Sequence, residues 1–190
     1  TMSYKWANEV RLDVLKVEGQ DSKLLFKTDK EEAEVYLDGQ DIGRVVHRHD
    51  GVETVITNEN SHHIVVGKGN EERDVFHYLK PNGPAPELRL GITKHRGVGT
   101  WSSLPHDFEL NLEPGFEEVF FHLLSGSKKR AIQVGEGVWH DNTSVKDAWF
   151  VEDHSFSTIP MGYHPVVGEP GTTVHYVWAY VCKKDSWEKI

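Results

Sequence analysis

Three separate segments of the chain carry side chains that could bind a divalent metal ion. Glu118 and His122 lie in one strand-like run. His106 lies in a short polar segment, and His164 lies in a corner rich in proline and glycine between two apolar runs. Imidazole and carboxylate ligands together suit Zn²⁺, Mn²⁺, Fe²⁺, Ni²⁺ or Co²⁺, with coordination positions left for water or substrate. A metal ion held in this way can polarise a carbonyl group or stabilise an enediolate, so the sequence predicts a divalent metal site.

Each of these residues also has a purely structural interpretation. Glu118 could lie in solvent at the start of a strand, and His122 could be a hydrogen-bonded histidine of the core. His106 could be a solvated loop residue, and His164 a turn histidine bonded to the backbone. Alternate side chains of a strand share a face, so Glu118 and His122 point the same way, where burial is costly unless they are paired or metal-bound. The combination, rather than any one residue, favours the metal site.

Other residues are weaker candidates. The pair in His47-Arg48-His49 has metal-ligand spacing but lies beside a glycine turn with no matching carboxylate strand. Gln133 and Tyr163 could meet a sugar hydroxyl, although ordinary pairing among buried polar groups explains them equally well. Trp101 is the one tryptophan beside the proposed site, where its ring could stack on a substrate.

Short apolar runs separated by Gly, Pro and Asn turns must position these residues. Such runs occupy residues 34–37, 54–57, 63–66, 75–79, 88–93, 118–124, 130–134, 147–151, 156–159 and 173–181. Many short strands with such turns indicate an all-β sandwich or barrel. No long 3.6-residue apolar period occurs, and the segment from Trp6 to Leu15 is the one candidate for a short helix.

The bulk composition limits the possible partners. The chain has 190 residues, a net charge of −9 and 37% hydrophobic residues, which fits a folded domain and argues against nucleic-acid or membrane-surface binding. Its single cysteine, Cys182, excludes an internal disulfide and suits a reducing compartment. No run approaches the roughly 18 apolar residues of a membrane span, and the N-terminal residues lack a signal-peptide core. We therefore expect a cytoplasmic protein.

The stretch from Pro81 to Pro86 is the clearest internal boundary. Residues before it are more polar, and residues after it carry most of the aromatic content. We predict a β-rich N-terminal extension, or a reduced first barrel half, over residues 1–80. Residues 81–190 are then the barrel that carries the site.

Five segments follow one another along the chain at residues 73–79, 101–107, 117–121, 160–167 and 176–179. In this order they resemble successive motifs of the 5-deoxy-glucuronate isomerase family and its 5-keto-4-deoxyuronate isomerase relatives. The similarity is to the C-terminal cupin half of longer, two-cupin members. It implies an all-β, cupin-type double-stranded β-helix (a jelly-roll barrel), and an enzyme of inositol catabolism.

The resemblance also implies a ligand set. In that family the metal is held by a His-x-His pair, a glutamate just before an aromatic strand, and a late histidine. Glu118 then takes the carboxylate role and His164 the late histidine. Only His106 remains of the pair, and His122, on the same face as Glu118, is the candidate replacement for the missing histidine.

The function implied is metal-dependent aldose–ketose isomerisation of a sugar acid, with a homodimer as the expected assembly. Glu117, His122 and Tyr163 are candidates for the base that moves a proton between adjacent carbons, and Trp101 and Gln133 for contacts with the substrate. Two alternatives stay open. One is a non-catalytic cupin that binds a sugar or another small ligand through a degraded site, and the other is a non-haem iron oxygenase.

Overall fold

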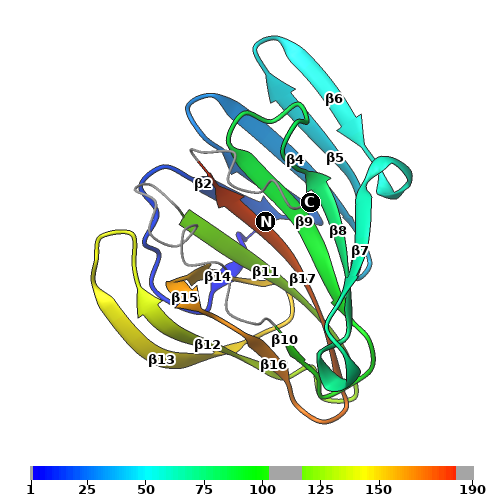
Figure 1. Ribbon diagram of the computed structural model, residues 1–190, viewed down its shortest axis with the longest axis vertical. Coiled ribbons are helices and arrows are strands. Elements are labelled where there is room, and N and C mark those ends of the chain that lie inside the picture. The colour runs from blue at the N-terminus through cyan, green and yellow to red at the C-terminus, as the bar shows by residue number, and fades with distance from the viewer. Residues whose placement is uncertain (1, 103–116, 183–190) are drawn as a thin grey trace.

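The computed structural model describes residues 2–102 and 117–182. These residues form three β-sheets and two single-turn 3₁₀ helices, Asn58–Asn60 and Gly69–Glu71, and contain no α-helix (Figure 1). The predicted all-β fold is confirmed. Among the same residues, no helix has the length and apolar character needed to cross a bilayer.

The central sheet contains strands from both ends of the chain. Its strands are β1 (Lys5–Trp6), β7 (His62–Val66), β8 (Arg73–Leu79), β9 (Leu88–His95), β11 (Glu117–Gly126), β14 (Ser155–Ile159) and β17 (Thr172–Val181). Their order is β1-β14-β11-β17-β9-β8-β7. Only β1 and β14 pair in parallel. The long strands β11 and β17 lie in the middle, so nearly all their side chains are buried.

The N-terminal sheet is a meander in chain order. Its strands are β2 (Lys16–Gln20), β3 (Lys23–Lys27), β4 (Glu31–Asp38), β5 (Asp41–His49) and β6 (Val52–Ile56). Two of its hairpins turn through two residues with positive φ, Asp21-Ser22 (51° and 63°) and Asp50-Gly51 (55° and 77°). Positive φ at both positions is the signature of the type I′ turn, whose twist matches antiparallel strands.

The third sheet carries the remaining strands. They are β10 (Trp101–Ser102), β12 (Ala131–Val138), β13 (Ser144–Val151), β15 (Met161–Tyr163) and β16 (Val166–Gly168). The order is β10-β16-β12-β13, and β15 also pairs with β12. Figure 1 shows this sheet and the N-terminal sheet on opposite sides of the central sheet.

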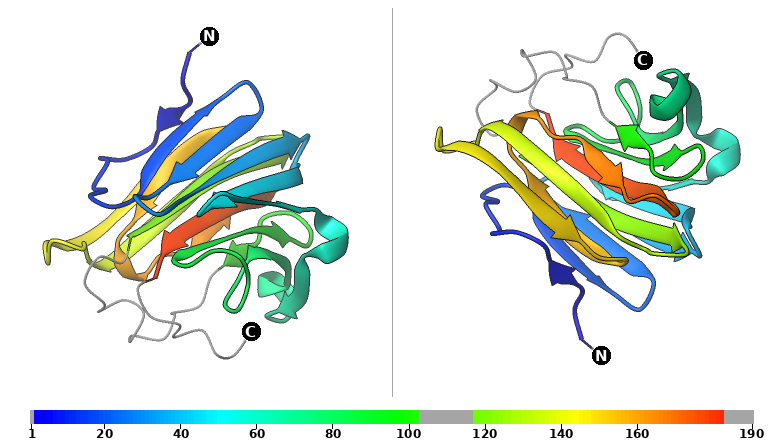
Figure 2. Two further views of the ribbon diagram at one scale, coloured as in Figure 1. Left: turned by 90° about the horizontal axis from the view of Figure 1, so that it is seen from above. Right: turned by 90° about the horizontal axis from the view of Figure 1, so that it is seen from below.

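Alternate residues of the central strands face two different cores. Val119 and Phe121 of β11 pack with apolar residues of the N-terminal sheet. Phe120 and Tyr176 pack with Val166 and other residues of the third sheet. The central sheet is therefore covered on both faces, as the views from above and below also show (Figure 2). The space between the central and third sheets is the one that the candidate ligands enter.

The division predicted at residues 80 and 81 falls between paired strands. β8, before the boundary, and β9, after it, are neighbours in the central sheet. The N-terminal sheet ends earlier, at Ile56.

The candidate helix from Trp6 to Leu15 was wrong. Trp6 belongs to β1, and the residues after it have no helical structure. The backbone N–H of Ala7 donates to the carbonyl of Phe156 (2.7 Å) instead of entering a helical turn. A backbone N–H group that donates to another strand is not available for a hydrogen bond within a helix.

Candidate metal site

Glu118 lies in the middle of the central sheet, on the face toward the third sheet. In the ladder it is paired with Ile159 of β14 and Tyr180 of β17. Its neighbour two residues on, Phe120, packs in the core between the two sheets. The alternation predicted for this strand is therefore confirmed, and it carries a carboxylate into an apolar interior, where only 3% of Glu118 is exposed.

Glu118 and His164 face one another across this interior. Glu118 Oε2 lies 3.8 Å from His164 Nε2, and both side chains are almost wholly buried. Glu118 Oε2 has no hydrogen-bond partner, and burial raises the pKa of this carboxyl to about 8. A buried carboxylate without a partner is costly, and a divalent cation would favour its ionised form. The two side chains therefore suit a metal ion.

His164 occupies the corner that the sequence predicted. It follows β15 and precedes β16, so two short strands paired with β12 fix its backbone. The ring of Phe120 lies edge-on to the His164 ring, with centroids 5.8 Å apart. Phe120 in turn stacks on Tyr176 at 4.5 Å, and the Tyr176 hydroxyl is 2.8 Å from Ser102 Oγ. The rings of Phe120 and Tyr176 thus form an aromatic wall of the core beside the His164 imidazole.

His122 shares the face of Glu118 but lies apart from it. Four residues at about 3.3 Å per residue separate their Cα atoms by about 13 Å, with Phe120 between them. His122 Nε2 instead lies 2.9 Å from Ser157 Oγ, and burial lowers the pKa of this imidazole to about 3. The structure thus brings Glu118 and His164 together and places His122 elsewhere in the same core.

Of the remaining predicted residues, Gln133 has a direct contact with His164. Gln133, wholly buried in β12, donates from Nε2 to the His164 carbonyl (3.4 Å). Tyr163 precedes His164 in the chain and is half-buried. Trp101 is half-buried in β10, at the edge of the third sheet. His106 lies outside the described residues.

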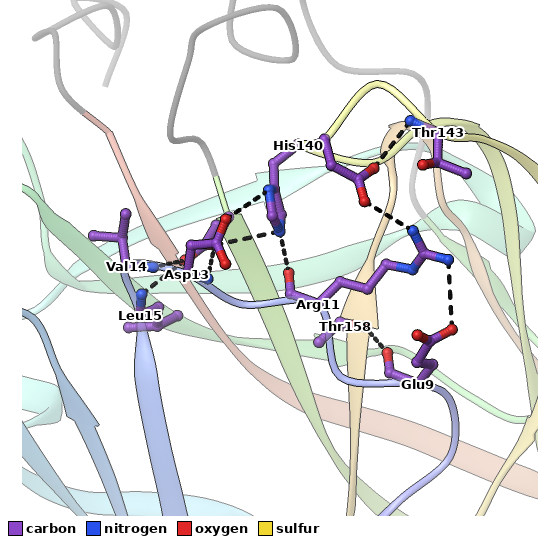
Figure 3. Close-up of polar contacts among 10 residues, drawn as sticks. Glu9, Arg11, Asp13, Val14, Leu15, His140, Thr143 and Thr158 are labelled. Carbon is purple, nitrogen blue, oxygen red and sulfur yellow. Dashed lines mark hydrogen bonds and ion pairs between the residues drawn. The ribbon is translucent and has the colours of Figure 1, made fainter.

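Glu117 points the opposite way from Glu118. Its Oε1 accepts hydrogen bonds from the backbone N–H groups of Val14 (2.8 Å) and Leu15 (2.7 Å), and its Oε2 accepts one from Asp13. Figure 3 shows these contacts at the N-terminal segment. Three backbone donors are a strong reason for a buried carboxylate to lie here, so the side chain fastens this segment to the start of β11.

A second group of possible metal ligands lies around Glu117. One ligand atom from each of Asp13, Glu117 and His140 lies within 4.8 Å of the others, and the described residues contain no other such group of three. Two of the three are already engaged, since Glu117 accepts three N–H groups and His140 Nε2 donates to the Arg11 carbonyl (2.6 Å; Figure 3). Sequence reasoning missed this group because no spacing pattern links residues so distant in the chain.

Comparison with known proteins identifies the family. The model of the KduI/IolB family matches residues 28–190. The chain is 29% identical over 126 residues to 5-deoxy-glucuronate isomerase of Halalkalibacterium halodurans, a match that covers 64% of this chain and 46% of that protein. It is 32% identical over 115 residues to the Geobacillus kaustophilus enzyme of the same name, covering 58% and 40%. The chain thus spans a little under half the length of these relatives.

The fold is also found among solved structures. An IolB-like protein from Salmonella typhimurium LT2 matches with a TM-score of 0.62 at 21% identity, covering 87% of this chain and 64% of that one. The all-β, cupin-type fold expected from the sequence is confirmed by this likeness, as is the resemblance that the motifs carried. Because the family model matches residues 28–190, the chain belongs to the KduI/IolB family.

Proposed function

We propose that this protein is a metal-dependent isomerase of a sugar acid, with Glu118 and His164 supplying two of the metal ligands. One observation carries the proposal. A carboxylate oxygen without a hydrogen-bond partner lies 3.8 Å from an imidazole nitrogen in a buried, aromatic-walled interior. A strongly perturbed carboxyl beside a histidine in such a place is a functional-site candidate, and ordinary core packing does not require it.

The relatives support the reaction class. The curated proteins that match are 5-deoxy-glucuronate isomerases, and the family model covers most of this chain. Because the chain spans only part of those proteins, the substrate is proposed by class, as an open-chain sugar acid with adjacent carbonyl and hydroxyl groups.

The residues have separate tasks in this proposal. Glu118 and His164 hold the cation, which when bound would act as a Lewis acid toward the substrate oxygens. Phe120 and Tyr176 exclude water from that position. Tyr163 is proposed to exchange the proton between the two carbons, in preference to Glu117, whose carboxylate accepts three backbone N–H groups on the opposite face.

The other expected site residues enter the proposal less directly. His106, outside the described residues, stays the proposed third ligand, and Trp101 a proposed contact with the substrate. Gln133 acts on the backbone of His164, and at most one of its N–H groups is left for a sugar hydroxyl. The metal would be Zn²⁺, Mn²⁺, Fe²⁺ or Ni²⁺, all of which accept mixed imidazole and carboxylate ligands.

Elemental analysis of untagged protein tests the proposal. We expect near-stoichiometric metal in the wild type and in Asp13→Asn, and its loss in His164→Ala. The loaded wild type should then interconvert aldose and ketose forms of 5-deoxy-glucuronate without consuming oxygen.

Three outcomes would contradict this assignment. Wild type that holds no metal and fails to bind added Zn²⁺, Mn²⁺ or Ni²⁺ would leave a non-catalytic, ligand-binding cupin. Metal lost in Asp13→Asn but kept in His164→Ala would move the site to the group around Glu117. Iron with substrate-dependent oxygen consumption would favour the oxygenase.

A further inference from the structure

A line of hydrogen-bonded polar groups runs through the core from β11 to the candidate ligand His164. His122 Nε2 lies 2.9 Å from Ser157 Oγ on β14. Ser157 Oγ donates to Gln133 Oε1 on β12, and Gln133 Nε2 donates to the His164 carbonyl at 3.4 Å. His122, Ser157 and Gln133 have no exposed surface, and His164 is 1% exposed. Four polar residues in a row are thus sealed inside an otherwise apolar interior.

The chemistry of the groups gives this line one direction. A peptide carbonyl can only accept, so the Gln133 amide nitrogen must face His164 and the amide oxygen must face Ser157. The amide oxygen can also only accept, so the Ser157 hydroxyl must donate its one hydrogen to that oxygen. Ser157 can then only accept from His122, which must carry its proton on Nε2. The donor and acceptor roles of Gln133, Ser157 and His122 therefore all follow from the His164 carbonyl.

The environment of the other ring nitrogen of His122, Nδ1, supports this assignment. His122 Nδ1 is buried without a hydrogen-bond partner, as suits a bare lone pair better than a buried N–H donor. The same burial keeps the imidazole neutral, since it lowers the pKa to about 3. His122 is therefore held as a single neutral tautomer.

We propose that Ser157 and His122 are positioning residues of the metal site. They fix the amide of Gln133, Gln133 holds the backbone of His164, and the His164 imidazole is thereby kept opposite Glu118. The functional consequence rests on the proposed metal site, whereas the hydrogen-bond line itself does not. His122, expected from the sequence as a replacement ligand, then acts through the ligand His164 and does not touch the metal.

Two matched pairs of variants test the proposal. Ser157→Ala breaks the line. Ser155→Ala removes a hydroxyl two residues away on the same strand, whose hydrogen bonds within the described residues are with Glu152. His122→Leu removes the terminal donor, whereas His122→Gln can still donate to Ser157 from a side-chain amide. Far-ultraviolet circular dichroism and thermal unfolding establish that each variant is folded before it is compared.

The first measurement is Zn²⁺ affinity by chelator competition. Partners that orient a ligand typically contribute about 10- to 100-fold to metal affinity. We expect a loss of about 10-fold in Ser157→Ala and His122→Leu, and none in Ser155→Ala and His122→Gln. Equal affinities of Ser157→Ala and Ser155→Ala in folded proteins would overturn the proposal, as would equal losses in the two His122 variants.

The second measurement separates this inference from the proposed function. Nitrogen-15 NMR of metal-free protein labelled at histidine reports the tautomer of each ring. We expect His122 protonated on Nε2 alone from pH 5 to pH 8, and His164 ring signals that move in Ser157→Ala but not in Ser155→Ala. A His122 proton on Nδ1, or unmoved His164 signals, would refute the positioning line even if the wild type binds metal. The expected spectra together with a wild type that binds no metal would refute the proposed function alone.

Discussion

Two buried glutamate–histidine pairs in this protein are built differently. In the first, Glu31 Oε1 of β4 lies 2.8 Å from His47 Nε2 of β5, and Glu31 Oε2 accepts from the backbone N–H groups of Glu87 (2.8 Å) and Leu88 (3.1 Å). Both side chains are almost fully buried. Every oxygen of that carboxylate is used, and the pair ties the N-terminal sheet to the start of β9.

The second pair is Glu118 and His164, at 3.8 Å and with one carboxylate oxygen lacking a partner. The residue types and the depth of burial match those of Glu31 and His47, so neither composition nor burial separates the two sites. The difference is whether the protein itself satisfies the carboxylate. A carboxylate that the protein satisfies stabilises the fold, whereas a carboxylate with an oxygen left without a hydrogen-bond partner is suited to a ligand.

The largest expected effect comes from replacing each glutamate by leucine, which has a similar volume. Glu31→Leu leaves His47 and two backbone N–H groups buried without an acceptor, so we expect a loss of about 4 kcal/mol in the free energy of unfolding. Glu118→Leu removes a buried carboxylate oxygen that has no hydrogen-bond partner, and should leave metal-free protein as stable or more stable. Urea unfolding with metal chelated measures both, and equal losses would abolish the distinction between the pairs.

The pH dependence of stability should also separate the pairs. The folded-state pKa of Glu118, about 8, lies above its usual value of 4.5, so the metal-free folded protein binds the extra proton between these values. Stability from this group is fully present below pH 4.5 and is lost as the pH rises toward 8, by about 3 to 4 kcal/mol between pH 5 and pH 8. The stability difference between wild type and Glu118→Leu, followed by urea unfolding from pH 5 to pH 8, should shift by that amount in favour of the variant. A constant difference would contradict the burial of a carboxyl group whose Oε2 has no hydrogen-bond partner.

Metal should stabilise through only one of the pairs. At 100 times its dissociation constant a ligand that binds only the folded state adds about 2.7 kcal/mol. We expect Zn²⁺ to raise the melting temperature of wild type and of Asp13→Asn, and a chelator to reverse the rise. Glu118→Leu and His164→Ala should not respond. A full response in His164→Ala would show that the ion binds elsewhere.

The smallest effect is expected at the exposed carboxylate of the other ligand group. The Asp13 side chain is 81% exposed and 3.5 Å from His140 Nδ1, a pair that solvent screens. Asp13→Asn should therefore unfold at the same urea concentration as wild type. A clear loss of stability would mean that this group, like Glu31 and His47, contributes to holding the fold together.

The strands that the sequence predicted well are those with apolar faces. The long runs that became β9, β11 and β17 are apolar enough to be recognised without their neighbours. β5 was missed because Arg44 and Arg48 alternate with its core residues, and its outward side chains bond charged partners such as Glu34. A mixed strand of that kind is stabilised by cross-strand pairs, which only the register reveals.

Some features of the site could be predicted from the sequence and others could not. The face on which Glu118 lies followed from the two-residue period of a strand, and the position of His164 followed from its corner between apolar runs. The orientation of Glu117 could not be predicted, because its partners are backbone groups about a hundred positions away. The carboxylate that pairs with His47 could not be predicted either, because Glu31 lies on the preceding strand, diagonally across the ladder.

The short strand β1 covers one rim of the central sheet. Without it, β14 would be the rim of the central sheet, with free N–H and C=O groups ready to pair with another chain. Two residues of parallel ladder cover that rim, and the Trp6 ring stacks on Phe156 with centroids 5.0 Å apart. A shortened form lacking residues 2–8 would therefore expose the unpaired edge of β14, the strand that carries Ser157. We expect that form to self-associate during folding.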